Sequence, residues 1–362
     1  MNHRSLRELL NAIVVLKFCT PFGFRTFEFL RRTTENSFFR HAFYYTIKQT
    51  AFKHFCAGEN LQEAIRTASR LKQHGLYSIL DWAAEKEPSQ TLEEQTINNN
   101  KNRIVESIKN GSLINAAVAV KLSSLLSPNL LTLKNVSLID KSFLDHIMQE
   151  AQRNNVDIYF DAEHSNIQPA IDEIVLELMV KYPGITFNTY QMYLANSYGR
   201  LVRDYERVTK LGLPFACKLV RGAYMMTEDA AILQPSLEAT HNNYNAAIEF
   251  LMQNMRTDSK SRCMIATHNK VSIQLASELV CKFKLENQVV FGQLLGMSDA
   301  TSTQLVEQGM KVYKYLPFGP PQQVLPYLSR RILENSPQFF STIQNATSED
   351  IEYFWRMLKN KF

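Results

Sequence analysis

Two short apolar runs, Asp157-Ile-Tyr-Phe-Asp161-Ala162 and Ile185-Thr-Phe-Asn-Thr-Tyr-Gln191, flank a helical pattern over Gln168–Lys181. Both runs are rich in β-branched and aromatic residues, which is typical of buried strands. The segment between them is long enough for a helix that returns the chain to the start of the next strand. This stretch therefore predicts a β-α-β unit with two parallel strands.

The same alternation continues along most of the chain. Further strand-like runs cover Tyr77–Trp82, Asn115–Leu122, Ala216–Val220, Met264–His268, Val289–Leu294 and Val312–Pro317. Helical patterns between the runs include Lys141–Asn154, Tyr198–Leu211, Glu228–Asn254, Val271–Phe283 and Ser302–Gly309. Eight strands alternating with helices predict a parallel (β/α)8 barrel. A doubly wound open sheet is the alternative, but no Gly-x-Gly-x-x-Gly follows any of these runs.

The two ends of the chain depart from this pattern. The first 75 residues carry helical patterns rich in aromatic residues, without an evident strand, so we expect residues 1–75 to form a helical arm or cap. The barrel is then expected to occupy residues 76–335. Residues 336–362 carry aromatic side chains at partly helical spacing and are expected to form a helical tail.

The bulk composition narrows the class of protein. A chain of 362 residues with 45% hydrophobic and 21% charged residues is globular, with a core large enough for a barrel. The net charge of +5 is mild, and no Lys/Arg tract interleaved with aromatics indicates nucleic-acid binding. Five cysteines without a Cys-x-x-Cys pair argue against a disulfide framework or a zinc site, so we expect no metal and a reducing, intracellular compartment.

Polar residues gather where the predicted strands end. In a barrel of this kind the chemistry lies at the C-terminal ends of the strands. The residues at or just beyond those ends are Lys121, Asp161, Glu163, Gln191, Lys218, Arg221, His268, Asn269, Gln293 and Tyr315. Strands that end at solvent would carry some polar residues, but fewer than are found here. The pattern does not by itself identify a reaction.

A further polar stripe lies near the C-terminus. Positions 327, 330, 331 and 334 share one face of a helix, because residues three and four apart are neighbours there. They hold Tyr327, Arg330, Arg331 and Glu334. Adjacent guanidinium groups suit bidentate capture of a carboxylate or phosphate. A solvated face with an intrahelical Arg330–Glu334 pair is the ordinary alternative.

Four motifs in order along the chain resemble the proline dehydrogenase family. They are Lys218-Leu-Val-Arg221-Gly222-Ala-Tyr224, Ala266-Thr-His-Asn269, Gln293-Leu-Leu-Gly-Met297 and Tyr327-Leu-Ser-Arg-Arg-Ile-Leu-Glu-Asn335. The resemblance covers nearly the whole chain. It implies a distorted (β/α)8 barrel with its final helix over the barrel mouth. It also implies FAD-dependent oxidation of L-proline to Δ1-pyrroline-5-carboxylate, the first step of proline catabolism.

The resemblance assigns roles to the candidate residues. Arg330 and Arg331 match the pair that binds the substrate carboxylate, and Tyr224, Leu294, Tyr315 and Tyr327 match the pocket for the ring. Lys121 resembles the active-site lysine and Asp161 its acidic partner, so the catalytic set is Lys121, Asp161, Tyr315, Arg330 and Arg331. The positions that the family uses for FAD hold Gln191, Lys218, Val220, Gly222, Thr267, His268, Asn269 and Glu334. Some members carry arginine in place of Lys218, and lysine keeps the charge but loses the fork.

Several alternatives stay open. Lys121 could be a Schiff-base nucleophile of a barrel aldolase, although a lysine beside Asp161 would stay charged and is then a positioning group. The chain could also be a catalytically silent amino-acid-binding protein. Either Asp81 or Glu85 could supply the acid that some family members place on the first strand to pair with an arginine. Which group removes the proton of the substrate amine is not decided by the sequence.

The resemblance also implies a substrate choice, partners and a location. Members that prefer hydroxyproline carry a smaller residue in place of Tyr315, so its ring favours L-proline. Family members pass electrons to a membrane quinone, and the short ones release their product to a separate pyrroline-5-carboxylate dehydrogenase. No Arg/Ser-rich, acid-poor leader opens the chain. We therefore expect a protein at the inner face of a bacterial cytoplasmic membrane, or a mature form from the mitochondrial matrix or inner membrane, with peripheral membrane contact.

Overall fold

The computed structural model describes residues 6–18, 45–46, 48–83, 94–127, 129–225, 227–321, 323–324, 327–328 and 341–359. At its centre eight parallel strands close into a barrel in sequence order. They are β1 (Leu76–Trp82), β2 (Ala117–Val120), β3 (Ile158–Phe160), β4 (Thr186–Gln191), β5 (Ala216–Val220), β6 (Arg262–Ala266), β7 (Val289–Leu294) and β8 (Val312–Phe318). The barrel predicted from the alternation of strands and helices is confirmed.

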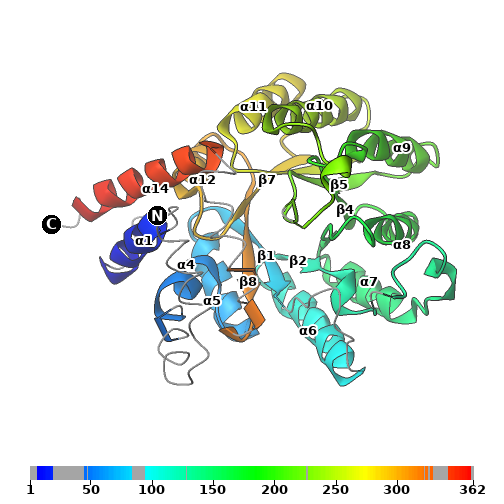
Figure 1. Ribbon diagram of the computed structural model, residues 1–362, viewed down its shortest axis with the longest axis horizontal. Helices are drawn as coiled ribbons and strands as arrows, with labels where there is room; N and C mark the ends of the chain where they lie inside the picture. Colours follow the sequence, from blue (N-terminus) through cyan, green and yellow to red (C-terminus); the bar gives the residue numbers. More distant parts are fainter. Residues whose placement is uncertain are drawn as a thin grey trace.

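Helices surround the strands, as Figure 1 shows. Those next to the barrel are α5 (Leu61–Lys72), α6 (Glu94–Ser112), α7 (Ser142–Asn154), α8 (Gln168–Lys181), α9 (Ser197–Thr209), α10 (Leu237–Met255), α11 (Lys270–Phe283) and α12 (Asp299–Glu307). Near the ends of the chain lie α1 (Leu6–Phe18), the π-helical turn η1 (Lys48–Phe52), α4 (Lys53–Phe55) and α14 (Ser341–Lys359). No described helix is long and apolar enough to cross a membrane.

Several boundaries differ from the expectation, and two of the differences lie near the barrel mouth. The sixth strand covers Arg262–Ala266 and not Met264–His268, so His268 and Asn269 lie beyond its end. The helix expected over Glu228–Asn254 was wrong at its start, because α10 begins only at Leu237. Pro235 precedes the start of α10, and the Ser236 hydroxyl caps the helix by accepting a hydrogen bond from the backbone N–H of Ala239 at 3.0 Å. The described residues 221–225 and 227–236 thus form a loop at the barrel mouth, with a short 3₁₀ turn at Ala230–Ile232.

The interior of the barrel is filled at the end where the strands begin. Small residues such as Ala117, Ala119 and Ala216 leave room there for large rings. Tyr159 and Phe187 stack in that space with their ring centroids 4.3 Å apart. The guanidinium of Arg262 holds both carboxylate oxygens of Asp157 at 2.8 and 2.6 Å at the N-terminal end of β6. Space for a ligand is therefore found at the opposite end of the barrel.

The two ends of the chain meet. Leu9, Ala12 and Ile13 of α1 share one apolar cluster with Phe354 and Met357 of α14, and Figure 1 shows the two helices side by side. After α4, the backbone N–H of Ala57 donates to the carbonyl of Pro317 at 2.7 Å, and that of Gly319 donates to the carbonyl of Gly58 at 3.0 Å. The residues that follow α4 are thereby tied to the end of β8 at the barrel mouth.

Candidate active site

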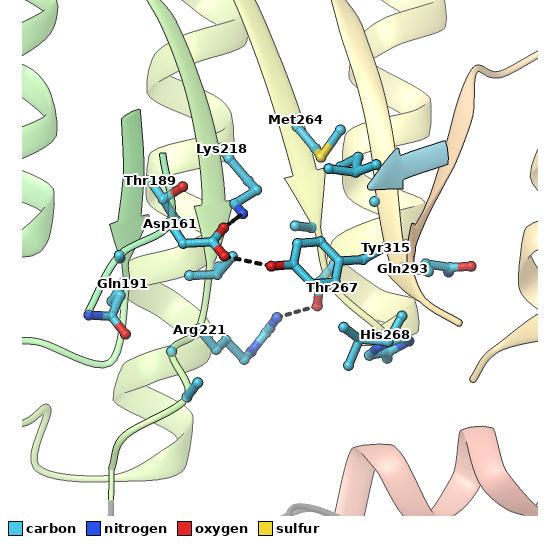
Figure 2. A pocket seen from close by; sticks show the side chains of 18 of the residues that line it. Asp161, Thr189, Gln191, Lys218, Arg221, Met264, Thr267, His268, Gln293 and Tyr315 are labelled. Atoms are coloured by element: carbon cyan, nitrogen blue, oxygen red, sulfur yellow. Dashed lines mark hydrogen bonds and ion pairs between the residues drawn. The ribbon is translucent and has the colours of Figure 1, made fainter. Parts of the chain in front are cut away.

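A single cavity at the C-terminal ends of the strands gathers the candidate residues. Every described residue to which the resemblance assigned a catalytic, substrate or FAD role lines it. They are Lys121, Asp161, Gln191, Lys218, Val220, Gly222, Tyr224, Thr267, His268, Asn269, Leu294, Tyr315 and Tyr327. Figure 2 shows several of these side chains converging on the cavity from different strands. Arg330, Arg331, Glu334 and Glu85 lie outside the described residues, as does most of the helix expected over the mouth.

A charged centre lies at the base of this cavity. Nζ of Lys218 is 2.6 Å from Oδ1 of Asp161, and Nζ of Lys121 is 3.3 Å from Oδ2 of the same carboxylate. Lys121 also binds Oδ1 of Asp81 at 2.6 Å. The phenol of Tyr315 donates to Oδ2 of Asp161 at 2.6 Å (Figure 2). Two ammonium and two carboxylate groups from four different parts of the chain thus form one balanced, buried network.

The electrostatics of this centre favour the ionised pair. Burial alone would raise the pKa of Asp161, but the Lys218 and Lys121 ammonium groups and the hydrogen bonds it accepts bring that pKa well below its usual range. Asp161 is therefore a carboxylate at neutral pH. Asp81 lies on β1 and contacts Lys121, whereas the arginines with which a first-strand acid was expected to pair lie outside the described residues.

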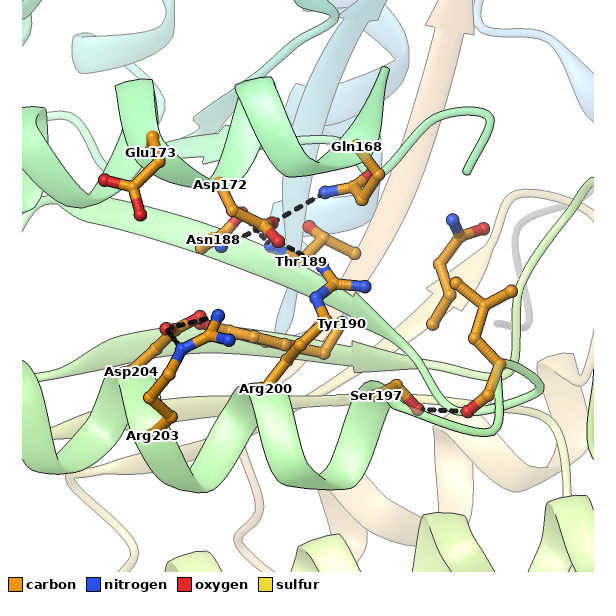
Figure 3. Close-up of polar contacts among 12 residues, drawn as sticks. Gln168, Asp172, Glu173, Asn188, Thr189, Tyr190, Ser197, Arg200, Arg203 and Asp204 are labelled. Atoms are coloured by element: carbon orange, nitrogen blue, oxygen red, sulfur yellow. Dashed lines mark hydrogen bonds and ion pairs between the residues drawn. The ribbon is translucent and has the colours of Figure 1, made fainter. Parts of the chain in front are cut away.

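The amide of Gln191 is oriented by a chain of buried polar groups. Its Nε2 donates to the carbonyl of Glu163 at 2.8 Å, and the backbone N–H of Glu163 donates to Gln168 Oε1 at 2.7 Å. Gln168 Nε2 in turn donates to Asp172 at 2.8 Å. Asp172 also forms a short ion pair with Arg200, so the chain of contacts reaches the outside of the barrel between α8 and α9 (Figure 3).

Glu163 itself is a buried acid next to the site. Its side chain accepts a hydrogen bond from the backbone N–H of Ser123 at 3.0 Å. Burial raises its pKa to about 7, and this effect exceeds the opposing effect of that hydrogen bond. The strand-end pattern pointed to Glu163, but its side chain does not line the cavity.

The start of α11 shapes the other half of the cavity. Asn269 caps this helix by accepting a hydrogen bond from the backbone N–H of Ser272 at 3.0 Å. Nδ1 of His268 lies 2.9 Å from the hydroxyl of Ser298. All three residues of the Thr-His-Asn motif line the cavity, and Asn269 also caps the helix.

Gly222 has a specific backbone requirement. Its φ of +130° is a conformation that residues with a side chain rarely adopt. A Cβ added there would lie 1.4 Å from the ring of Tyr193. A side chain at this position would therefore clash with the ring of Tyr193, while the backbone of Gly222 itself lines the cavity.

Several cavity residues had no assigned role. Gln293 and Arg221 carried a signal, because the sequence placed both at strand ends. Thr189, Met264 and His241 carried none, since the first two lie within strands and His241 lies inside α10. Only the closed barrel shows that these side chains share the cavity.

The donor set fits a large polar cofactor with an apolar ring system. Nε2 of Gln293 is buried, lines the cavity and has no hydrogen-bond partner among the described residues. A buried amide donor of this kind is costly to leave unpaired, so it fits an acceptor atom of a bound group. The same cavity is lined by the amide of Gln191, the ammonium of Lys218 and the apolar side chains of Val220, Met264 and Leu294. Flavins combine ring acceptors with a flat apolar face, so these residues fit FAD.

A closed parallel barrel with a charged, ligand-sized cavity at the strand ends defines the class as a (β/α)8 barrel with an enzyme-type site. The family follows from comparison with known proteins. The model of the proline dehydrogenase family matches residues 64–341. This chain belongs to that family, as the four motifs indicated.

Individual relatives support the same family assignment. Proline dehydrogenase 1, mitochondrial, of Dictyostelium discoideum is 31% identical over 378 residues, covering 87% of this chain and 65% of the relative. The human protein of that name is 35% identical over 59% of this chain and 37% of its own length. Human hydroxyproline dehydrogenase is also 35% identical, over 60% of this chain and 51% of its own length. The chain thus spans about a third to two thirds of the length of the curated relatives it matches.

Comparison with solved structures supports the same barrel fold. Proline utilization A from Bdellovibrio bacteriovorus, solved after inactivation by N-propargylglycine, superposes with a TM-score of 0.73. The match covers 85% of this chain and 35% of that one, at 19% sequence identity. At this identity the likeness establishes the shared barrel and not the activity.

Proposed function

We propose that this protein oxidises L-proline to Δ1-pyrroline-5-carboxylate with bound FAD and passes the electrons to a membrane quinone. The observation that carries the proposal is the charged centre formed by Lys121, Asp161, Lys218 and Tyr315. It lies in the same cavity as the amides of Gln191 and Gln293. It occurs in a chain of the proline dehydrogenase family, at the strand ends where barrel enzymes do their chemistry.

FAD would be held by Gln191, Lys218, Val220, Gly222, Thr267, His268, Asn269 and Glu334. When bound, FAD supplies the acceptor for a hydride from the carbon next to the substrate amine. The ammonium of Lys218, fixed by Asp161, supplies a positive charge at the cavity wall. Such a charge favours the electron-rich form of the cofactor, which is the usual protein contribution to its tuning.

The substrate would lie between the cofactor and the residues of the mouth. Tyr224, Leu294, Tyr315 and Tyr327 give an aromatic and aliphatic lining for a five-membered ring. We propose that Arg330 and Arg331 bind its carboxylate, as in the family. Lys121 is fixed by Asp81 and Asp161 and repels a protonated amine, which favours binding of the amine as the free base.

The contacts of Lys121 disfavour the aldolase alternative. A lysine nucleophile needs a neutral amine with a free lone pair. An ammonium held 2.6 Å from one carboxylate and 3.3 Å from a second is stabilised in its charged form. We therefore assign Lys121 a positioning and electrostatic role.

Proline is favoured over hydroxyproline. Relatives with both names match this chain at the same 35% identity, so overall similarity does not discriminate between the two substrates. Tyr315 favours proline over hydroxyproline, because its ring lines the cavity and its hydroxyl is already bound to Asp161. A hydroxyl added to the substrate ring would have to compete for this space and these contacts.

The proposal also covers the fate of the product and the location of the protein. The product would be released to a separate pyrroline-5-carboxylate dehydrogenase. The mitochondrial names of several relatives support a mitochondrial location, at the inner membrane or in the matrix. A peripheral site on the bacterial cytoplasmic membrane is the alternative.

The deciding experiment is the visible spectrum of the purified protein, followed by anaerobic titration with L-proline. Flavin bands that bleach with proline are expected. Bands that do not bleach would mean a flavin protein with another substrate. If flavin bands are absent even after FAD is added back, the flavin proposal is wrong.

A further inference from the structure

The loop between β5 and α10 carries Tyr224, one of the residues that line the cavity. Both ends of this loop are fixed to Tyr193, just beyond β4. The backbone N–H of Tyr193 donates to the carbonyl of Arg221 at 2.9 Å, and the backbone N–H of Gln234 donates to the carbonyl of Tyr193 at 2.7 Å. Tyr224 lies between these two anchor points, so its position depends on what holds the middle of the loop.

Glu228 holds the middle of the loop. Its side chain is 5% exposed, and it reaches Ser165 in the loop between β3 and α8. The backbone N–H of Ser165 donates to Oε1 of Glu228 at 2.8 Å, although 63 residues separate the two in the chain. The hydroxyl of Ser165 donates to Oε2 in a second, short hydrogen bond. One carboxylate thus joins two loops of the barrel mouth, and hydrogen bonds to a charged acceptor are stronger than neutral ones.

A tight turn connects Glu228 to Tyr224. The backbone N–H groups of Thr227 and Glu228 donate to the carbonyl of Tyr224 at 2.9 and 3.1 Å. The hydroxyl of Thr227 donates to the same oxygen at 3.0 Å. Because one carbonyl accepts all of these hydrogen bonds, the turn moves as a unit. A shift of Glu228 is therefore passed on to Tyr224.

His164 contacts both residues from the other loop. Its ring centroid lies 4.2 Å from that of Tyr224, and its Nδ1 lies 3.8 Å from Oε1 of Glu228. The backbone at His164 is itself fixed, because its carbonyl accepts hydrogen bonds from the backbone N–H groups of Ile167 and Gln168 at 3.1 and 3.0 Å. The imidazole is thus a fixed surface against which the ring of Tyr224 packs while Glu228 holds the turn in place.

We propose that Glu228 is a positioning residue for substrate binding, because it holds the ring of Tyr224 where that ring meets the substrate. The inference rests on the proposed function, in which Tyr224 contacts the ring of L-proline. Glu228 itself does not line the cavity, so its effect on the substrate passes through Tyr224. Such a contact is made in the ground state and in the transition state alike. Its loss is therefore expected to raise KM more than it lowers kcat.

The test is a double-mutant cycle on the FAD-bound protein, with kcat and KM for L-proline measured by dye reduction. Glu228→Ala is expected to raise KM about 10-fold, the effect of losing hydrogen bonds to a charged group, with the FAD content unchanged. In the Tyr224→Ala background the same change should raise KM by less than about 2-fold, because the residue through which Glu228 acts is gone.

Two further variants complete the experiment. Glu228→Gln should restore most of the lost affinity, because its amide oxygen can accept from the backbone N–H of Ser165 and its amide nitrogen can donate to the hydroxyl oxygen. Asp229→Asn is the control and should change neither kcat nor KM. It removes an exposed carboxylate from the same loop and keeps an acceptor for the backbone N–H of Ala231.

Three results would overturn the proposal. They are an unchanged KM in Glu228→Ala, an equal rise in KM with and without the ring of Tyr224, and a rise that merely follows loss of FAD. If Glu228→Ala fails to fold, Ser165→Ala takes its place in the cycle. It removes one of the two hydrogen bonds and should raise KM about 3-fold, and an unchanged KM would again contradict the proposal.

A failure of the proposed function would be seen separately. If L-proline does not reduce the wild type, that function is wrong, and hydrogen exchange of the amides of residues 221–236 still tests the connection between the two loops. Exchange is expected to be faster in Glu228→Ala than in the wild type and unchanged in Glu228→Gln. Equal rates in all three proteins would show that Glu228 does not hold the loop.

Discussion

The phenol of Tyr315 on β8 donates a hydrogen bond of 2.6 Å to Asp161 at the end of β3, although 154 residues separate the two in the chain. The same carboxylate binds Lys218 and Lys121. Lys121 also lies 3.2 Å from the phenol oxygen. Tyr315 is thus part of the charged centre as well as a ring that limits the cavity.

Removing only the hydroxyl separates these two roles. In Tyr315→Phe the ring stays and the hydrogen bond to Asp161 is lost. We expect kcat/KM for L-proline to fall by about 10-fold, the cost of one hydrogen bond to a charged group. Anaerobic flavin reduction with L-proline measures this. Unchanged kinetics would show that the hydrogen bond has no part in the reaction.

Removing the ring tests the specificity. Tyr315→Ser opens space beside Asp161 and leaves a hydroxyl that can pair with a polar substrate. We expect activity with hydroxyproline to rise relative to activity with proline, measured as the ratio of the two kcat/KM values. Tyr315→Phe keeps the volume and serves as the control, with no expected gain. A serine variant that gains no hydroxyproline activity would count against the pocket assigned here.

Asp161 holds the two lysines together, so its charge should matter more than its shape. Asp161→Asn keeps the size but leaves two buried ammonium groups with Asp81 as the carboxylate that still balances them. We expect a loss of stability of about 3 kcal/mol, typical of a broken buried ion pair. We also expect a loss of activity of about 100-fold or more, because the positions of Lys121 and Lys218 both change.

Urea unfolding and proline-dependent dye reduction are the measurements for Asp161→Asn. Asp140→Asn is the matched control, because Asp140 is exposed and asparagine keeps an oxygen that can accept the hydrogen bond from the backbone N–H of Ser142. A stable, active Asp161→Asn protein would mean that the ion pairs do not organise the site.

The sequence predicted the barrel well because buried parallel strands leave a strong local signal. Most strands are short apolar runs with a polar residue at or near the mouth end. The helix start at Leu237 was missed because the residues after Glu228 have a helical pattern, whereas the Pro235-Ser236 stop and cap decide the boundary.

The site was predicted in part for the same reason. Lys121, Asp161, Lys218 and Tyr315 follow from strand ends and motifs, but their mutual contacts depend on barrel closure, which no local pattern encodes. His241 faces the cavity from α10, and Arg221 has neutral partners on α10 and α11. Such contacts join parts of the chain that are far apart, so they appear only with the tertiary structure.

Glu163 should make the stability depend on pH. Its pKa rises from an ordinary 4.5 to about 7 on folding, so between these values the native state holds a proton that the unfolded state has lost. Its contribution is therefore fully present below pH 4.5 and declines as the pH rises to about 7. Glu163→Gln removes this dependence. Relative to the wild type, the variant should gain up to about 3 kcal/mol in unfolding free energy between pH 4.5 and pH 8.

Urea unfolding at the two pH values tests the prediction for Glu163. The control is Glu286→Gln, because Glu286 is exposed and should change stability equally at both. Parallel curves for the wild type and Glu163→Gln would show that this carboxyl group titrates alike in the folded and unfolded states.

A second buried acid links the C-terminal helix to the barrel. Asp350 of α14 accepts a hydrogen bond of 3.1 Å from the backbone N–H of Ala300, at the start of α12. Burial and the neighbouring Asp299 raise its pKa to about 7. Asp299 is itself paired at 2.9 Å with Lys314, which is fully buried on β8 next to Tyr315. Two carboxyl groups thus share one ammonium group beneath α14.

This arrangement predicts that α14 is held less firmly as Asp350 ionises. The folded-state pKa is raised, so the stabilisation is complete below the ordinary value of 3.8 and is lost as the pH rises to about 7. Hydrogen exchange of the α14 amides, corrected for the intrinsic rate, should be faster at pH 8 than at pH 6. Asp350→Asn keeps an acceptor for Ala300 and removes the charge, so its α14 should exchange alike at both values. The exposed Glu352→Gln on the same helix should behave as the wild type does, and an Asp350→Asn protein that keeps the pH dependence would place its origin elsewhere.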